Sequence, residues 1–130
     1  MKKILVLLLL MVSTNVFAEW TRVDNSPDGN MIVYIDYETI KKKGNKVKIW
    51  SLIDFKTVQK SSYGKYLSFV SRNEYDCEEE TRRMLDLYSY SGNMRDGEQV
   101  YSQSNIKDEG TSIIPVSIDE VLFKIACSKK

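Results

Sequence analysis

The sequence contains no histidine, and this absence excludes a large part of enzyme chemistry. Ser-His-Asp and Cys-His arrangements need an imidazole base, and His-containing zinc sites are excluded in the same way. The two cysteines, Cys77 and Cys127, stand 50 positions apart, which leaves no C-x-x-C redox pair and too few thiolates for a zinc site. The sequence also lacks GxSxG and phosphate-binding glycine motifs, although paired carboxylates for glycoside cleavage remain open. We therefore expect a protein that is not an enzyme and that uses no cofactor or metal.

The sequence contains only one long apolar run, and this run lies at the N-terminus. Lys2 and Lys3 precede ILVLLLLMV, and the run Val16-Phe17-Ala18 places small residues at the positions of a cleavage site. An uncleaved anchor helix is the alternative, but the apolar run is shorter than the roughly 20 residues that span a bilayer. The sequence predicts a signal peptide over residues 1–18, removed after Ala18. The mature chain would then be periplasmic, or secreted to the medium or cell surface, with no integral membrane segment.

No Pro/Gly/Ser-rich linker or internal repeat divides residues 19–130, so we expect a single domain. Without Lys2 and Lys3, 17 basic side chains stand against 18 acidic ones, a net charge of about −1. This charge does not indicate a nucleic-acid partner. Eight tyrosines and two tryptophans in so short a chain favour a β-rich fold whose sheet faces carry large side chains.

The predicted export places the two cysteines in an oxidising compartment. In an oxidising compartment they most simply form one disulfide, although free or intermolecular thiols remain open. Closing a loop of this length stabilises a fold by about 4 kcal/mol in the chain-entropy model. We therefore interpret Cys77 as a structural cross-link and not as a nucleophile.

Strand patterns occupy most of the chain. The clearest is KVKIWSLIDF, in which Val47, Ile49 and Ile53 alternate with Lys48 and Trp50, as on the two faces of a sheet. We expect residues 38–43 to form a single helical turn that ends at the Gly44-Asn45 pair. The short connections favour antiparallel order. The expected strands cover residues 20–24, 31–37, 46–55, 66–77, 82–92 and 97–104.

The C-terminal region carries the pattern of a helix. Residues 117–120 fit the S-x-x-E capping box just after Pro115. Because a single helix needs a sheet to cover, we expect an α+β fold in which the helix covers about six mainly antiparallel strands. Cys127 lies well away from the apolar stripe of this helix, so either the helix unwinds just before Cys127 or its Phe123 side is buried too. The stripe consists of Ile118, Val121, Leu122 and Ile125.

Several runs together resemble the surface-adhesin protein E family of small exported bacterial domains. The resemblance is carried, in order, by AEWTRV, IVYIDYETIKKKGNKVKIWSLIDFKTVQK, KYLSFVSRNEYDC, YSYSGNMRDGE and VLFKIAC. It implies a six-stranded antiparallel sheet with a C-terminal helix and a disulfide between Cys77 and Cys127. It also implies extracellular adhesion in host-associated members, sometimes as a dimer, so that a host extracellular-matrix or serum protein and a homodimer are the partners to consider.

Two groups of side chains are candidates for binding a partner. Lys41, Lys42 and Lys43 in KKKGNKVK could meet an anionic glycan, an acidic patch of a serum protein or lipid headgroups, although a solvated turn needs no ligand. Tyr88, Tyr90 and Tyr101 fall on neighbouring predicted strands and could form an exposed aromatic recognition face. The alternative is that these tyrosines pack against the helix or against a second copy of the chain.

The acidic run around Glu78 carries a weaker signal. Its oxygen atoms suit Ca²⁺, but the run lacks the glycine-punctuated spacing of a calcium loop, and Arg82 and Arg83 stand beside it to neutralise it.

Two functions remain: an adhesive module that binds a protein or matrix partner, and a periplasmic structural, accessory or inhibitor protein with no host ligand.

Overall fold

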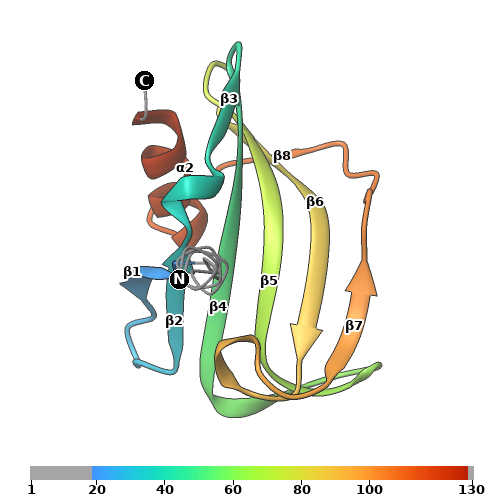
Figure 1. Cartoon of the computed structure of the whole chain (residues 1–130). Helices are drawn as coiled ribbons and strands as arrows, with labels where there is room; N and C mark the ends of the chain where they lie inside the picture. Colours follow the sequence, from blue (N-terminus) through green and yellow to red (C-terminus); the bar gives the residue numbers. More distant parts are fainter. Residues whose placement is uncertain (1–18, 129–130) are drawn as a thin grey trace, which may run out of the picture.

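The computed structural model describes residues 19–128, which form one twisted antiparallel sheet with a helix against one face (Figure 1). The predicted signal peptide lies outside the described residues, and its removal after Ala18 stays a prediction. The strands are β1 (Thr21–Asn25), β2 (Met31–Ile35), β3 (Lys41–Lys43), β4 (Lys46–Ser61), β5 (Gly64–Asp76), β6 (Thr81–Tyr90), β7 (Gln99–Gln103) and β8 (Thr111–Ser112). The helical segments are η1 (Tyr37–Thr39), η2 (Asn93–Arg95) and α2 (Ile118–Ser128).

The strand order confirms the predicted α+β class. Six strands follow one another in the order β1-β2-β4-β5-β6-β7, and every pairing is antiparallel. The long β4–β5 hairpin forms the middle of this sheet, as Figure 1 shows. Two short strands were not expected: β3 pairs with β4, and β8 pairs with the start of β6.

The prediction of a helical turn over residues 38–43 is wrong for Lys41–Lys43, which form the strand β3. A short helical turn does form at Tyr37–Thr39, where the Asp36 carboxylate accepts the backbone N–H of Glu38. The chain then extends, and β3 pairs with the start of β4. Gly44, with a φ of +63°, allows the tight turn between these two strands, because glycine enters the left-handed region without steric cost.

The core lies between α2 and the sheet. Leu122 and Ala126 of α2 pack on Val47, Ile49 and other buried side chains of the sheet. The predicted capping box supplies the start of the helix, since the Ser117 hydroxyl accepts the backbone N–H of Glu120 at 3.2 Å. The helix therefore covers the β4 side chains that the alternation in KVKIWSLIDF assigned to one face.

The end of α2 settles the position of Cys127. The helix continues to Ser128, and Cys127 forms a disulfide with Cys77, with 5.7 Å between the two Cα atoms. Phe123 lies on the same side of the helix and contacts Tyr75 edge to face, with 6.3 Å between the ring centroids. Of the two expected alternatives, the second therefore holds: the helix does not unwind before Cys127, and its Phe123 side is partly buried against the core. Burial raises the pKa of the Tyr75 phenol, so this side chain stays neutral within the core.

Candidate functional site

The face of the sheet opposite α2 carries an open aromatic groove. Trp50 and Leu52 of β4 alternate with the residues that pack on the helix, so they point to this second face. Leu52 pairs with Val70 of β5, which pairs with Tyr88 of β6, and the buried Val70 forms the floor of the groove. The groove has a volume of about 410 Å³. Its lining consists of Trp20, Asp36, Thr39, Trp50, Val70, Tyr88, Tyr90, Arg95 and Gln99.

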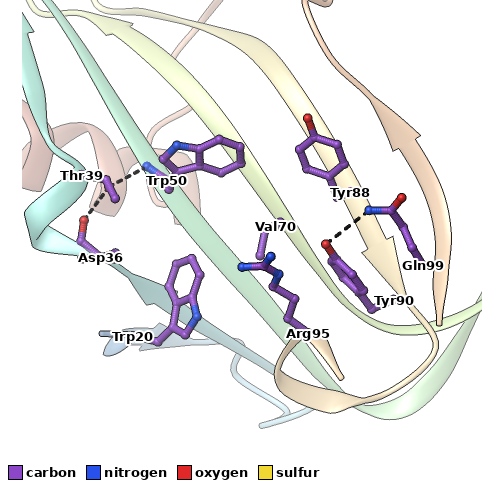
Figure 2. A pocket seen from close by; sticks show the side chains of 9 residues that line it. All are labelled: Trp20, Asp36, Thr39, Trp50, Val70, Tyr88, Tyr90, Arg95 and Gln99. Carbon is purple, nitrogen blue, oxygen red and sulfur yellow. Dashed lines mark hydrogen bonds between the residues drawn. The ribbon is translucent and has the colours of Figure 1, made fainter. Parts of the chain in front are cut away.

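Figure 2 shows how these side chains surround the groove. The two indoles of Trp20 and Trp50 lie on one side of Val70, and the phenols of Tyr88 and Tyr90 lie on the other. Arg95 reaches into the space between the rings. The arrangement offers flat aromatic surfaces at the walls and polar groups at the rim, which is the composition of many small-ligand sites.

An ion pair fixes the aromatic wall formed by Trp50 and Tyr88. The two rings are stacked, with their centroids 6.1 Å apart and their planes 20° apart. The Arg72 guanidinium lies 5.7 Å from the Trp50 ring centroid, at cation–π distance. Arg72 Nε also donates to the buried Asp86 carboxylate at 2.6 Å. The position of this wall is therefore set before any ligand arrives.

The segment that carries Arg95 is fastened to the sheet by hydrogen bonds. The Asp54 carboxylate accepts the backbone N–H of Met94 at 2.8 Å and the side-chain amide of Asn93 at 3.1 Å. The Ser68 hydroxyl accepts the backbone N–H of Arg95 at 2.9 Å. These bonds hold η2 over the end of the β4–β5 hairpin and place Arg95 above the Tyr90 ring, 5.7 Å from its centroid.

This segment is also strained. Met94 and Arg95 both have left-handed backbone conformations, with φ of 53° and 66°, which residues other than glycine seldom adopt. Gly92 is required for a different reason: a Cβ there would lie 2.9 Å from the Asp96 carbonyl oxygen. Strained conformations persist where surrounding structure holds them, and they concentrate at binding sites.

The structure places the predicted lysine cluster on the same face as the groove. Lys41 pairs with Lys48 and Lys43 pairs with Lys46, so these four side chains share the face of Trp50, while Lys42 pairs with the buried Val47. All five lysines are exposed, and together with Glu74 they line a second hollow of about 420 Å³. Lys48 stands two residues before Trp50, so the cluster and the groove are neighbours along β4.

The three predicted tyrosines do not share a face. Tyr88 and Tyr90 line the groove, but Tyr101 lies on the other side of the sheet, where its ring contacts Tyr63 with 4.4 Å between centroids. The reason is the register, because Tyr101 pairs with Ser89, which alternates with Tyr88 and Tyr90 on β6. Tyr88 and Tyr90 therefore remain a pair, and Tyr101 belongs to a separate apolar hollow.

The acidic run serves the local structure. The Asp76 carboxylate accepts the backbone N–H groups of Glu78 and Glu79, which shapes the turn between β5 and β6. The Glu74 carboxylate pairs with Arg83 at 2.9 Å. Within residues 19–128, no three Asp, Glu or Cys side chains gather in a way that could hold a metal ion.

Comparison with known proteins fits this architecture. A profile of the family described as surface-adhesin protein E matches residues 20–128. The chain belongs to the surface-adhesin protein E family. No curated protein matches the chain in sequence.

Structures of Haemophilus influenzae protein E share the fold of this family member. Crystal form II of that protein superposes with a TM-score of 0.63 at 15% identity, covering 89% of this chain and 92% of the other. A second structure of Haemophilus influenzae protein E gives a TM-score of 0.62 at 17% identity, covering 89% of each chain. Protein E from non-typeable Haemophilus influenzae gives 0.61 at 16% identity, covering 89% of this chain and 80% of the other.

Family membership supports an adhesin-like protein with an exported or surface location. Within residues 19–128, no helix is long and apolar enough to cross a membrane. The run YSGNM, which carried much of the resemblance in sequence, contains the glycine and the asparagine that form the segment holding Arg95.

Sequence reasoning missed seven of the nine groove residues, among them Trp20, Trp50 and Arg95. The alternation in KVKIWSLIDF did place Trp50 on the face away from the core, and this signal could have been used. Trp20 and Arg95 come from segments far apart in the sequence, and no periodic pattern relates them to β4.

Proposed function

We propose that this member of the surface-adhesin protein E family is an exported, non-enzymatic binding module that attaches to a host extracellular-matrix or serum protein. The observation that carries the proposal is the open groove with its preset aromatic wall, on a sheet face that α2 leaves uncovered. Aromatic side chains in such a position supply large contact areas with little conformational freedom to lose on binding. The absence of histidine from the whole sequence favours binding over catalysis.

The lysine cluster supports the same face as the attachment surface. Its exposed side chains add positive charge beside the groove and would speed the approach of an acidic partner. Tyr101 and its neighbours offer an apolar hollow on the other side of the sheet, where a second copy of the chain could pack to form a homodimer.

We predict that two changes on the groove face weaken attachment in different ways. With an immobilised extracellular-matrix extract and immobilised serum proteins, the Tyr88→Ser/Tyr90→Ser variant should bind at least about tenfold more weakly at any salt concentration, as expected for aromatic hot spots. Reversing the charges of Lys41, Lys42 and Lys43 to Glu should weaken binding severalfold at about 0.05 M salt and much less at about 0.5 M, because salt screens exposed charges. Biolayer interferometry on the purified, oxidised domain measures both effects.

Matched controls exist on other surfaces of the domain. Tyr101→Ser removes the same ring from the opposite face, and Lys60→Glu/Lys65→Glu reverses charges at the far end of the β4–β5 hairpin. Neither should change the affinity of a single copy of the domain for its partner. If the parent domain binds no matrix or serum component, the adhesive proposal is wrong, and a periplasmic structural, accessory or inhibitor role replaces it.

We propose that residues 1–18 are removed during export. We predict that intact-mass measurement of the protein recovered from the periplasm, cell surface or medium gives a chain that begins at Glu19, because Val16-Phe17-Ala18 has the form of a signal-peptidase site. A recovered mass that still includes Met1 to Ala18 contradicts both the cleavage and the proposed location.

A further inference from the structure

We propose that the aromatic groove binds an acidic saccharide, with a sugar ring stacked on the wall of Trp50 and Tyr88 and an anionic substituent held by Arg95. The occupant we infer is a linear acidic polysaccharide of the matrix type, which bears carboxylate or sulfate groups. This inference rests on the proposed function, because the acidic saccharide would be the part of the matrix partner that enters the groove.

The walls of the groove suit a sugar ring. The C–H groups of a pyranose present a flat, weakly positive surface, and aromatic rings carry negative charge on their faces. The stacked pair of Trp50 and Tyr88 is fixed by Arg72, so it offers such a face without rearrangement. A volume of about 410 Å³ lies in the usual range for small-ligand sites and leaves room for one or two rings.

Hydroxyl groups require polar partners at the edges of the groove, and these are present. Gln99 is exposed, and its side-chain amide lies 3.4 Å from the Tyr90 hydroxyl. Asp36 and Thr39 stand at the other edge, where the Asp36 carboxylate is nearly buried and accepts the Glu38 backbone N–H. A carboxylate that also accepts from a ligand hydroxyl suits a sugar better than a purely apolar ligand.

Arg95 supplies the preference for an acidic ligand. Its guanidinium forms no ion pair with a carboxylate within residues 19–128 and stacks on the Tyr90 ring. The strained backbone at Met94 and Arg95 is held by the Asp54 and Ser68 hydrogen bonds, so the charge is positioned in advance. A planar guanidinium binds carboxylate and sulfate oxygens through paired N–H groups.

The lysines indicate that the ligand continues beyond the groove. Lys41, Lys43, Lys46 and Lys48 share the groove face, and none of them pairs with a carboxylate within the described part of the chain. Strand residues rise by roughly 3.3 Å each, so Lys48 stands about 7 Å along β4 from Trp50. A linear polyanion that leaves the groove along β4 meets these charges in succession. A single acidic sugar would not need them.

The two tryptophans make the test direct, because they are the only two in the sequence and both line the groove. The oxidised domain is titrated with a heparin-derived hexasaccharide, with a neutral maltohexaose and with oligoglutamate of matching charge, and tryptophan fluorescence and heat are both recorded. We expect the acidic hexasaccharide to change the fluorescence and to bind at least about tenfold more tightly than maltohexaose. Oligoglutamate should bind the lysines weakly and leave the fluorescence unchanged.

Variants assign the binding to the groove. Arg95→Gln should lower the affinity for the hexasaccharide about tenfold or more, whereas Lys124→Gln, which removes one charge from the outer surface of α2, should not. Thermal unfolding checks that both variants stay folded. Equal binding of acidic and neutral hexasaccharides, binding with no tryptophan signal, or an unaffected Arg95→Gln variant would each overturn the saccharide site. Matrix attachment that persists in such a case leaves the proposed function standing, so the two failures are distinguishable.

Discussion

Replacing either Cys77 or Cys127 with alanine is expected to lower the free energy of unfolding by about 4 kcal/mol. The disulfide closes a loop of 50 residues, and its loss returns that conformational freedom to the unfolded chain. It also releases the last turn of α2 from the end of β5. Urea denaturation of the two variants, followed by circular dichroism, measures the change.

The double variant provides the control for this prediction. Because each single change already breaks the disulfide, the two losses of unfolding free energy should not add. The double variant should lose little more unfolding free energy than either single variant. Losses that add in the double variant would show that the cysteines act separately. The disulfide lies on the helix side of the sheet, so ligand binding by the single variants should survive in cold buffer.

Leu122→Ala is expected to lower the free energy of unfolding by about 2–5 kcal/mol, because it leaves a cavity between α2 and the sheet. Leu122 is 3% exposed and belongs to the core cluster with Val47 and Ile49. Lys124→Ala is the matched control in the same helix, since the Lys124 side chain is 72% exposed and its ion pair with Glu120 is a surface pair. The control should change stability by less than about 0.5 kcal/mol.

The same urea measurement shows whether α2 is held on the sheet by its disulfide alone or also by the packing of Leu122. A loss close to that of the control would mean that α2 is held mainly by its disulfide and adds little by packing. A loss in the expected range means that packing and cross-link both secure the helix.

Local signals in the sequence were sufficient for most of the fold. The alternation in KVKIWSLIDF separated Val47 and Ile49 from Lys48 and Trp50, and the structure places these pairs on opposite faces. The Ser117 capping box gave the start of α2. The strand β3 was not foreseen, because three lysines after a short helical turn do not show that Gly44 reverses the chain and pairs them with β4.

The candidate site was harder to predict because it depends on register. Tyr101 joined Tyr88 and Tyr90 in the predicted recognition face, since neighbouring strands are visible in a sequence while their relative offset is not. The bulge between Ser89 and Tyr90 and the pairing of Ser89 with Tyr101 set that offset. The position of Arg95 depends on side-chain hydrogen bonds across about 40 residues, which leave no periodic trace.

The order of the elements along the chain has a consequence for biogenesis. If the protein crosses the membrane from its N-terminus, the β4–β5 hairpin emerges before α2, and the side chains that α2 buries meet water or a chaperone in the meantime. Cys77 emerges 50 residues ahead of Cys127. In that interval it has no intramolecular thiol with which to pair, so incorrect oxidation can occur only with another molecule.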